Sequence, residues 1–473
     1  MSDKELVIFG SGRGGTLTGR MLRSMGYSIR GYVDNDPKKW GTELDGKQIN
    51  PPESILEHNI PVVIASMWEN EIKEQLNGMG AGDRVLEKAA CAREYMQSRI
   101  QDYVYVSEYP VQESGKKPVF VFGMDLGLFH GGIESWVYVV GDALKERGFR
   151  IKIFTSKQSG RPPERFAEDV CYVDVNGEDY VAGVRDMIRL LLETSPCIVI
   201  DSWQNMTMMA ASIVRYLNPS AVLSLIEVVH GNMPKLFQAV RQFEPYLDYC
   251  MCVSRDLNQV LTGQYQVNPE KVRYKESPVK YGSAERSYET DGRRPVRIGF
   301  AGRLDTLDKR ADLLMPLMTM LAERKICFRM QIAGVGKLSK PIELYIEEHH
   351  LQDCVSYMGF IPREEMDSFW KDQDIFISLS ESEGVGLSML EAIGNGCVPV
   401  VTRVSGSTEF VLPKIGYICD IGDLQTMADH IEYLSHHRDE MAQMGRRGME
   451  RTRERCSVDG YIDYLLDLTG MSS

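Results

Sequence analysis

A glycine-bearing segment, SLSESEGVGLSMLEA at residues 378–392, lies between two apolar runs at residues 374–378 and 398–401. This order predicts a buried strand, a loop, a helix and a second buried strand. Gly384 and Gly386 let backbone N–H groups come close to a ligand, because glycine carries no Cβ. The first N–H groups of the following helix have no partner within the helix. We therefore expect this loop to bind an anion such as a diphosphate.

Two carboxylates flank the loop. Glu383 precedes the glycines, and Glu391 follows Leu387 by one helical turn, so both side chains can face one cavity. A carboxylate accepts hydrogen bonds at two oxygens, which suits the vicinal hydroxyls of a ribose or a hexose. Two acids on a helix are usually surface residues. Here they bracket a glycine loop between buried strands, and this favours a binding site.

The segment resembles the E-x7-E signature of the family 4 (group 1) glycosyltransferases of the GT-B fold. The resemblance covers roughly the last three-quarters of the chain. It implies an α/β protein with two facing Rossmann-like domains, to which this chain adds a third at the N-terminus. It also implies transfer of a sugar from a nucleoside diphosphate sugar with retention of the anomeric configuration. A UDP-sugar is the usual donor in this family.

Length, composition and charge limit the other classes. The 473 residues predict about three domains. A net charge of −13 argues against a general nucleic-acid-binding protein. No apolar run approaches the roughly 18–20 residues of a membrane span, and the start of the chain does not resemble a secretion signal. The ten cysteines are scattered without a C-x-x-C pair, which indicates reduced thiols. We expect a cytoplasmic protein and leave open a position at the inner face of the membrane.

The first hundred residues contain a second glycine motif, GSGRGG at residues 10–15. It follows a predicted strand, precedes a predicted helix, and is followed by a strand that ends at Asp34. Gly10, Gly12, Gly15 and Asp34 are therefore candidate ligand residues of a dinucleotide-type βαβ unit. The unit resembles the N-terminal Rossmann-like domain of bacterial sugar O-acyltransferases. Because one such motif is a weak signal, ligand binding and a purely structural role are equally expected.

Two further candidates lie in the middle of the chain. The sequence GGIES at residues 131–135 resembles the first glycine loop of the same glycosyltransferases, and this implies that Gly131 and Gly132 face the donor diphosphate. His130 beside it fits either a substrate contact or a loop cap. His230 directly follows an apolar strand, at the end of the strand where α/β folds bind ligands. The resemblance implies that His230 contacts the transferred sugar.

Two cations precede a predicted helix near residue 310. Arg303 and Lys309 lie in a stretch that resembles the family pattern GRL…KG.D.L. An arginine fork and a lysine point charge both suit a pyrophosphate. The stretch departs from the pattern in two ways: Arg310 replaces the usual glycine, and the loop is one residue longer. These departures affect where the Lys309 side chain is expected to lie, more than they affect which residue corresponds to the lysine of the family pattern.

Three more loops match the family pattern. Gly334 lies in a strand-turn that resembles "i.G.G", and Phe360 and Ile361 follow a stretch that resembles "v.f.G.v". The resemblance implies that these loops line the pocket for the base. The stretch 406–409 resembles the family's "GG..E" loop, with one glycine replaced.

The predicted organisation has four parts. Residues 1–105 form the Rossmann-like N-terminal domain, and residues 117–288 form the acceptor-side domain. Residues 293–455 form the domain that binds the nucleotide sugar. Residues 456–473 form a helix that crosses back to the acceptor side.

The resemblance assigns roles to the candidate residues. Glu391 would hold the ribose hydroxyls, and Glu383 would orient the donor sugar. Arg303 and Lys309 would stabilise the leaving diphosphate, so neither a metal ion nor a cofactor is required. Backbone N–H groups would meet the phosphates at Gly384, Val385, Gly386 and Leu387.

We therefore predict a retaining hexosyltransferase of bacterial surface-polysaccharide or glycoconjugate synthesis. Its partners would be a UDP-sugar and a glycan, lipid-linked or protein acceptor, but not a nucleic acid. A basic run at residues 271–275 leaves a peripheral membrane contact open. Two alternatives are a catalytically silent nucleotide-sugar-binding regulatory protein and an NAD-dependent enzyme that uses the N-terminal domain. The retained charges of the central site argue against the first, and the lack of a catalytic partner domain argues against the second.

Overall fold

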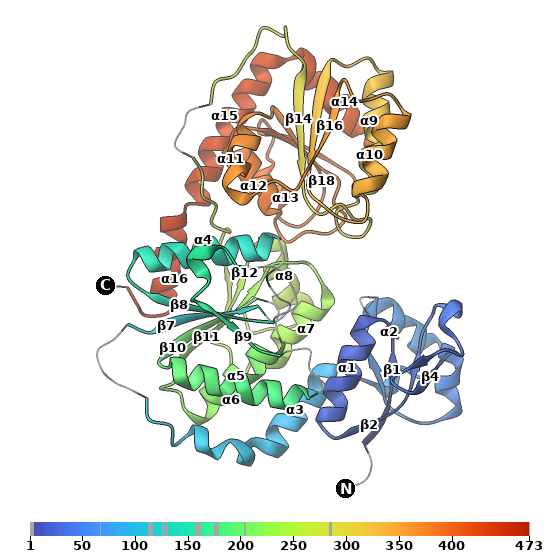
Figure 1. Cartoon of the computed structure of the whole chain (residues 1–473), viewed down its shortest axis with the longest axis vertical. Coiled ribbons are helices and arrows are strands. Elements are labelled where there is room, and N and C mark those ends of the chain that lie inside the picture. The colour runs from blue at the N-terminus through green and yellow to red at the C-terminus, as the bar shows by residue number, and fades with distance from the viewer. Residues whose placement is uncertain are drawn as a thin grey trace.

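The computed structural model describes residues 4–66, 68–111, 117–124, 128, 131–156, 162–174, 179–202, 205–282 and 286–472. Three mainly parallel sheets follow one another along the chain. They form three bodies, which we call the N-terminal, middle and C-terminal domains (Figure 1). The α/β fold predicted from the sequence is therefore confirmed.

The N-terminal domain is built on a six-stranded sheet with the order β3-β4-β2-β1-β5-β6. Its strands are β1 (Lys4–Phe9), β2 (Tyr27–Val33), β3 (Glu43–Leu44), β4 (Lys47–Asn50), β5 (Val62–Ile64) and β6 (Val85–Leu86). Its helices are α1 (Arg13–Ser24), α2 (Glu69–Gly78) and α3 (Lys88–Arg99). The segment after α3 is fastened to the middle domain, because the Asn218 amide donates to the carbonyls of Val106 (3.0 Å) and Tyr109 (3.1 Å).

The middle domain contains a seven-stranded sheet with the order β13-β12-β11-β10-β7-β8-β9. Its strands are β7 (Val119–Met124), β8 (Arg150–Thr155), β9 (Val170–Tyr172), β10 (Cys197–Asp201), β11 (Val222–Val229), β12 (Tyr249–Cys252) and β13 (Val272–Tyr274). Its helices are α4 (Gly132–Glu146), α5 (Tyr180–Thr194), α6 (Asn205–Leu217), α7 (Pro234–Phe243) and α8 (Arg255–Gln259). Every residue of β7 and β10 is buried, which explains why these strands are nearly continuous apolar runs in the sequence.

The C-terminal domain has a six-stranded sheet with the order β16-β15-β14-β17-β18-β19. Its strands are β14 (Val296–Ala301), β15 (Phe328–Ala333), β16 (Val355–Gly359), β17 (Ile375–Ser378), β18 (Val398–Thr402) and β19 (Tyr417–Cys419). Its helices are α9 (Leu314–Glu323), α10 (Ser339–Glu348), α11 (Arg363–Lys371), α12 (Leu387–Gly394), α13 (Ser407–Phe410), α14 (Leu424–His436) and α15 (Arg438–Arg455). The unit β17–loop–α12–β18 contains the glycine-bearing segment, and β17 and β18 are parallel neighbours.

The chain passes twice between the middle and C-terminal domains. After α15 it returns to the middle domain as α16 (Val458–Leu468), which packs against α4 (Figure 1). The two passages lie side by side, since the Val279 N–H donates to the Cys456 carbonyl at 3.0 Å. Arg455 pairs with Glu276 across them at 2.8 Å. Glu409 adds a third link by accepting hydrogen bonds from the Arg255 N–H and the Tyr274 hydroxyl.

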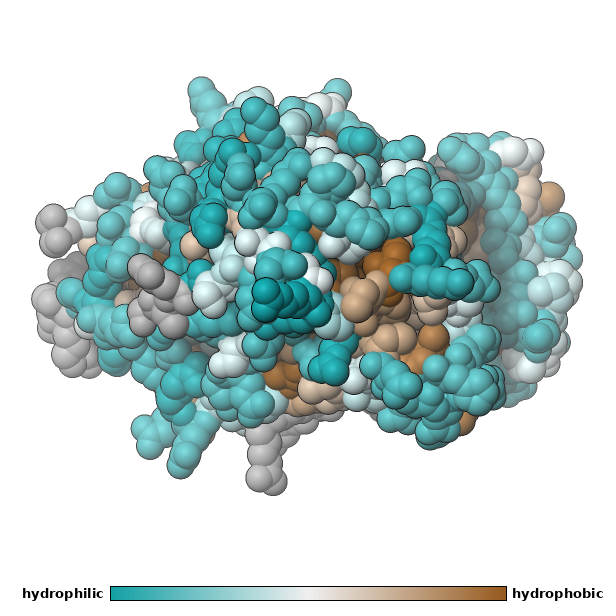
Figure 2. Space-filling view, turned by 90° about the horizontal axis from the view of Figure 1, so that it is seen from above, coloured by the Kyte–Doolittle hydropathy of each residue, from teal (hydrophilic) through white to brown (hydrophobic). Residues whose placement is uncertain are grey.

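The polarity of the surface and the reduced state of the cysteines agree with what the sequence composition predicts. Seen from the C-terminal domain, most of the surface is hydrophilic, with one group of apolar residues near the middle of the view (Figure 2). All ten cysteines are free, and most of them are buried. Within the described ranges, no helix combines the length and the hydropathy needed to cross a bilayer.

Candidate active site

The start of α12 is open to a ligand. Gly386 precedes the helix with a φ of +72°, in the left-handed region that favours glycine. No side chain caps this end of the helix. The first N–H groups of α12 therefore depend on water or a ligand for their hydrogen bonds, which is the usual basis of an anion site.

The loop before α12 meets the end of β11 from the other domain. A Cβ at Gly384 would lie 1.9 Å from the carbonyl oxygen of His230. Only a glycine fits at this distance, so the close approach of the two domains requires the residue that the sequence provides. The structure thus brings together Gly384 and His230, which are far apart in the sequence.

Lys309 and Glu383 form an ion pair beside this loop. The Glu383 carboxylate also accepts a hydrogen bond from the Ser380 hydroxyl at 2.8 Å. Both members of the pair are mostly buried, with exposed side-chain fractions of 20% for Lys309 and 15% for Glu383. Although its loop is one residue longer than the family pattern, Lys309 therefore lies next to the glycine-bearing segment.

Arg310 explains how the altered loop is accommodated. Its backbone has φ and ψ of 45° and 42°, in the left-handed region, where the resembling sequences carry glycine. Its side chain pairs with Asp312 and Glu381, each at 3.2 Å. The backbone has kept a conformation suited to glycine, although the residue has changed.

Arg303 is held by acids of its own loop. It pairs with Asp305 and Asp308 at 2.9 Å each, and 56% of its side chain is exposed. It shares the loop with Lys309, but its ion pairs are with these two acids and not with Glu383.

Glu391 lies in a partly buried position within α12, with 19% of its side chain exposed. Burial raises the pKa of its carboxyl, and the nearby Arg363 acts in the opposite direction. Arg363 Nη2 lies 4.0 Å from Glu391 Oε1. Among the described residues, the buried Nη1 of Arg363 has no hydrogen-bond partner. Arg363 was not among the residues predicted from the sequence, although it follows the candidate Ile361 by only two residues.

His230 is neutral at physiological pH. Its ring packs edge-on against Trp136 with centroids 4.9 Å apart, and its Nε2 lies 3.3 Å from the Ser202 hydroxyl oxygen. Burial lowers the pKa of His230 to about 3. The side chain can therefore donate or accept a hydrogen bond, but it does not supply a positive charge.

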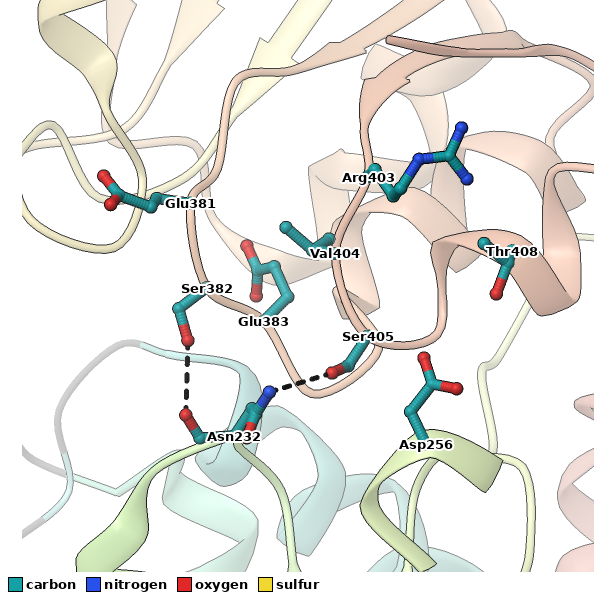
Figure 3. Close-up of a pocket in the computed structure, with 9 residues that line it drawn as sticks. All are labelled: Asn232, Asp256, Glu381, Ser382, Glu383, Arg403, Val404, Ser405 and Thr408. Carbon is teal, nitrogen blue, oxygen red and sulfur yellow. Dashed lines mark hydrogen bonds between the residues drawn. The ribbon is translucent and has the colours of Figure 1, made fainter. Parts of the chain in front are cut away.

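A cavity of about 380 Å³ lies where the middle and C-terminal domains meet (Figure 3). Hydrogen bonds cross it from Asn232 to Ser405 (3.2 Å) and from Ser382 to the Asn232 carbonyl (3.4 Å). The carboxylate of Asp256 points from α8 toward the C-terminal domain (Figure 3). The lining residues come from both domains: Asn232, Asp256, Glu381, Ser382, Glu383, Arg403, Val404, Ser405 and Thr408.

Sequence reasoning selected only Glu383 from this lining. Asn232 lies two residues beyond His230, and Ser405 and Thr408 lie in or beside the stretch 406–409. Their proximity to the recognised motifs was the available signal. Asp256 and Arg403 carried no such signal.

Two family models match the two domains around this cavity. Residues 130–275 match the model Glycosyltransferase Family 4, and residues 287–451 match Glycosyl transferases group 1. Both models describe glycosyltransferases, and for that reason we call the two matched domains the glycosyltransferase unit. Residues 2–86 match a third model, described as C2185-like, N-terminal.

Curated relatives of the glycosyltransferase unit match over shorter stretches. The amylovoran biosynthesis glycosyltransferase AmsK of Erwinia amylovora is 30% identical over 142 residues, which is 28% of this chain and 35% of the relative. The poly(ribitol-phosphate) alpha-N-acetylglucosaminyltransferase of Staphylococcus aureus is 26% identical over 194 residues, which is 40% of this chain and 38% of the relative. The chain thus spans well under half the length of these relatives.

Solved structures show the same fold at low identity. TarM superposes with a TM-score of 0.60 and 14% identity, over 76% of this chain and all of TarM. HepE of Anabaena, solved with UDP and glucose, superposes with a TM-score of 0.61 and 13% identity, over 75% of this chain and all of HepE. The predicted GT-B architecture is therefore confirmed.

The first glycine loop of the glycosyltransferase unit faces α12. Gly131 immediately precedes α4, and Gly132 is its first residue. A Cβ at Gly132 would lie 3.6 Å from the Leu387 side chain, so the starts of α4 and α12 approach each other across the cleft. His130 lies outside the described residues.

The loops that resemble the base pocket lie on the C-terminal domain. Gly334 directly follows β15 and packs against the Gly302 carbonyl, whose oxygen a Cβ would approach to 1.9 Å. Phe360 is 48% exposed and Ile361 is partly buried. They directly precede α11, which carries Arg363 toward Glu391.

The candidate residues of the N-terminal domain are also brought together. Gly10 directly follows β1, and Gly12 precedes α1 without a side-chain cap. A Cβ at Gly15 would lie 2.1 Å from the Gly10 carbonyl oxygen. The three glycines therefore form one tight turn at the carboxyl end of β1.

Asp34 completes this turn by accepting hydrogen bonds from its own domain. The donors are the Ser11 N–H (2.9 Å), the Ser11 hydroxyl, the Asp36 N–H (2.9 Å) and the Lys39 ammonium (3.0 Å). Burial alone would raise the pKa of Asp34, but these donors lower it to about 2. The carboxylate that would meet a ribose is thus already engaged by the protein.

Proposed function

We propose that this chain is a retaining hexosyltransferase that transfers a sugar from a UDP-sugar to an acceptor hydroxyl. The observation that carries the proposal is the Lys309–Glu383 ion pair beside the uncapped start of α12, within the interdomain cleft. Such a site offers fixed positive charge and N–H donors to a diphosphate, and a carboxylate to a sugar hydroxyl. HepE, which shares the fold, was solved with UDP and glucose, and this supports the choice of donor.

The donor would lie along the C-terminal domain. Glu391 would accept hydrogen bonds from the ribose hydroxyls, with the charge of Arg363 opposing the effect of burial on the pKa of this carboxyl. The N–H groups at the start of α12 would meet the diphosphate, and the loops at Gly334 and residues 360–361 would flank the base. Glu383 would orient the sugar at the mouth of the cleft.

The chemical step would depend on charge stabilisation. When the donor is bound, its diphosphate would replace Glu383 as the partner of Lys309, and Asp305 and Asp308 as partners of Arg303. Both cations would then stabilise the negative charge that develops on the leaving diphosphate, a contribution typically of several kcal/mol. We propose that these cations replace a metal ion in this role.

His230 would contact the transferred sugar through a hydrogen bond. Because its pKa is lowered to about 3, it would act as a neutral imidazole and would not add a second positive charge. The leaving phosphate itself would help to deprotonate the acceptor hydroxyl on the same face, which gives retention without a dedicated carboxylate base.

The acceptor is proposed to belong to bacterial surface-glycan synthesis at the cytoplasmic side of the membrane. Support comes from the names of the relatives, which include an amylovoran biosynthesis enzyme and an enzyme that acts on poly(ribitol phosphate). A glycan, lipid-linked or protein acceptor fits a cleft whose walls come from two domains.

A nucleotide-sugar screen tests the proposal. Thermal shift and release of nucleoside diphosphate would be measured on the wild type and on the variants Glu391→Ala, Arg303→Ala and Asp34→Asn. We expect one donor to stabilise the wild type and to be slowly hydrolysed, with both effects weakened in the first two variants and kept in Asp34→Asn. If only Asp34→Asn loses the stabilisation, the nucleotide binds to the N-terminal domain and the assignment of the cleft is wrong.

A further inference from the structure

The cavity between the middle and C-terminal domains lies to one side of the proposed donor site. In the C-terminal sheet, the loops after β14, β15 and β16 carry most of the proposed donor contacts, whereas the loops after β17 and β18 line the cavity. In the middle sheet, Gly131 and Gly132 follow β7, whereas Asn232 and Asp256 follow β11 and β12. The strand order of both sheets therefore displaces the cavity from the donor.

Glu383 belongs to both regions. Its carboxylate pairs with Lys309 of the loop after β14, and the same residue lines the cavity. Glu383 is proposed to orient the transferred sugar at the mouth of the cleft. A ligand in the cavity would thus lie next to the point of sugar transfer, on the side away from the loops that are proposed to flank the base.

The lining of the cavity is almost entirely polar. Of its nine residues, Val404 is the one apolar member in the described part of the chain, and the others carry a charge, an amide or a hydroxyl group. These side chains supply both donors and acceptors of hydrogen bonds. The volume of about 380 Å³ lies near the lower end of the range of small-molecule sites, about 300–1,000 Å³. The cavity therefore suits a small ligand that carries several hydroxyl groups.

Asp256 provides an acceptor that has no partner in the protein. Within the described ranges, its carboxylate forms neither a hydrogen bond nor an ion pair. It points from the middle domain toward the segment that carries Ser405 and Thr408 on the C-terminal domain (Figure 3). Because a carboxylate accepts at two oxygens, it can bind two neighbouring hydroxyls of one sugar ring.

The charge balance of the cavity disfavours an anionic ligand. Both glutamates of the lining already pair with basic side chains of the C-terminal domain. Arg403, the one cation of the described lining, lies 3.6 Å from Asp420. The charge that is left without a partner is the negative charge of Asp256, and it would repel a phosphate or a carboxylate.

Two long hydrogen bonds cross the cavity. The Asn232 amide donates to the Ser405 hydroxyl at 3.2 Å, and the Ser382 hydroxyl donates to the Asn232 carbonyl at 3.4 Å. These distances lie at or beyond the long end of the usual range, so both bonds are weak. A sugar hydroxyl can take the place of either partner and still join the two domains.

We propose that this cavity binds an uncharged sugar unit of the acceptor, held by Asp256 of the middle domain and Thr408 of the C-terminal domain. The acceptor is then a glycan that presents a neutral sugar next to Glu383, and it carries no phosphate or carboxylate on that sugar. This inference rests on the proposed transferase function, and it names the class of acceptor and two residues that recognise it.

Titration of simple glycosides tests the site. The methyl glycosides of glucose, galactose, mannose and N-acetylglucosamine would be titrated into the full-length protein with saturating UDP, and their NMR signals would report binding. We expect one of them to bind, roughly tenfold more weakly to Asp256→Ala and about threefold more weakly to Thr408→Val. The 6-phosphate of the same sugar should bind more weakly than the methyl glycoside. The proposal is wrong if no glycoside binds, if Asp256→Ala keeps the full affinity, or if the phosphate binds more tightly.

Two further variants serve as controls. Asp353→Ala removes an exposed carboxylate before the start of β16, whereas the cavity lies at the carboxyl ends of the strands, and it should match the wild type. Asp256→Asn keeps the size of the side chain and part of its hydrogen bonding, so its loss of affinity should be smaller than that of Asp256→Ala. Asp256→Asn also replaces Asp256→Ala in the titration if the alanine variant does not fold.

Measurements with the donor separate this inference from the proposed function. If Asp256→Ala weakens binding of the intact UDP-sugar but of no methyl glycoside, the cavity holds the transferred sugar and the acceptor assignment is wrong. A wild type that binds a glycoside through Asp256 but hydrolyses no UDP-sugar contradicts the transferase proposal alone. Hydrolysis by the wild type, together with glycoside binding that neither cavity variant weakens, contradicts this inference alone.

Discussion

The two glycine loops of this protein share a framework and differ in what their charged side chains contact. Both follow a buried parallel strand and open a helix that lacks a side-chain cap. In the N-terminal domain, Asp34 accepts four hydrogen bonds from its own domain. In the C-terminal domain, Glu383 pairs with Lys309, which comes from another loop, at the edge of a cavity shared with the middle domain.

This difference determines what a ligand must displace in order to bind at each loop. A ligand at Asp34 would have to displace backbone and side-chain donors that hold the turn together. A diphosphate at Lys309 would replace one anion with another, and Glu383 would remain free to bind a sugar hydroxyl. Under the proposed function, a glycine loop therefore contributes to stability in one domain and to ligand binding in the other.

The largest expected effect is on turnover at the C-terminal loop. Lys309→Ala should lower the rate of UDP release roughly 10²–10³-fold, because a fixed cation that stabilises developing charge is removed. Steady-state kinetics with the donor found in the screen would measure it. Asp34→Asn serves as the matched control and should keep the wild-type rate. A Lys309→Ala variant with full activity would end the functional distinction between the two loops.

Next in size is the stability provided by the N-terminal loop. Because the folded-state pKa of Asp34 is lowered from 3.8 to about 2, its ionised form stabilises the fold above pH 3.8, and this stability is lost as the pH falls toward 2. Asp34→Asn should reduce the free energy of unfolding at neutral pH by about 2 kcal/mol. Urea unfolding at pH 7 and pH 3 would show this, with the two proteins converging at the lower pH. A constant difference would contradict the role of the charge.

A third prediction concerns His230 in the cleft, which affects stability in a higher pH range than Asp34 does. His230 has a folded-state pKa of about 3 against an ordinary value of 6.5, so the unfolded chain takes up a proton that the folded protein does not. Stability should therefore fall as the pH drops below 6.5, by about 1.4 kcal/mol at pH 5.5 from this residue alone. The variant His230→Gln should lack this component in denaturant titrations at pH 7.5 and 5.5. If its pH dependence equals that of the wild type, the imidazole is protonated in the folded state.

The smallest expected effect concerns Arg310. The left-handed backbone costs an L-residue about 1 kcal/mol, and glycine avoids this cost. The ion pairs of Arg310 with Asp312 and Glu381 are partly exposed and contribute less than about 1 kcal/mol. Arg310→Gly should thus leave stability unchanged or raise it by a few tenths of a kcal/mol. A clear loss in melting temperature would show that the ion pairs hold the Lys309 loop in place.

Sequence reasoning worked best where the pattern was local. The unit β17–loop–α12–β18 could be predicted because apolar strands and a glycine-bearing turn are adjacent in the chain. The contact between Lys309 and Glu383, 74 residues apart, was not predicted. The resemblance assigned both residues to the donor site, but spacing in the sequence could not show that they pair. Asp256 was missed because only the topology of β12 and α8 brings it to the cavity.

The glycine motif at residues 10–15 could not have predicted the hydrogen bonds that the Asp34 carboxylate accepts within its own domain. Its donors include Ser11, which occupies a variable position of the glycine pattern, and Lys39, which lies beyond it. Whether a carboxylate at a strand end is open or occupied depends on side-chain directions, and the sequence pattern does not encode these. The structure therefore distinguishes two loops that the sequence describes in similar terms.

The paired passages between the middle and C-terminal domains define a pivot. Because the Val279–Cys456 hydrogen bond and the Arg455–Glu276 ion pair join them at one edge, the domains are tethered there by two lengths of backbone. If the two domains separate, they would therefore rotate about this edge. Such a separation would break the two hydrogen bonds that cross the cavity, one donated by the Asn232 amide to Ser405 and one donated by the Ser382 hydroxyl to the Asn232 carbonyl.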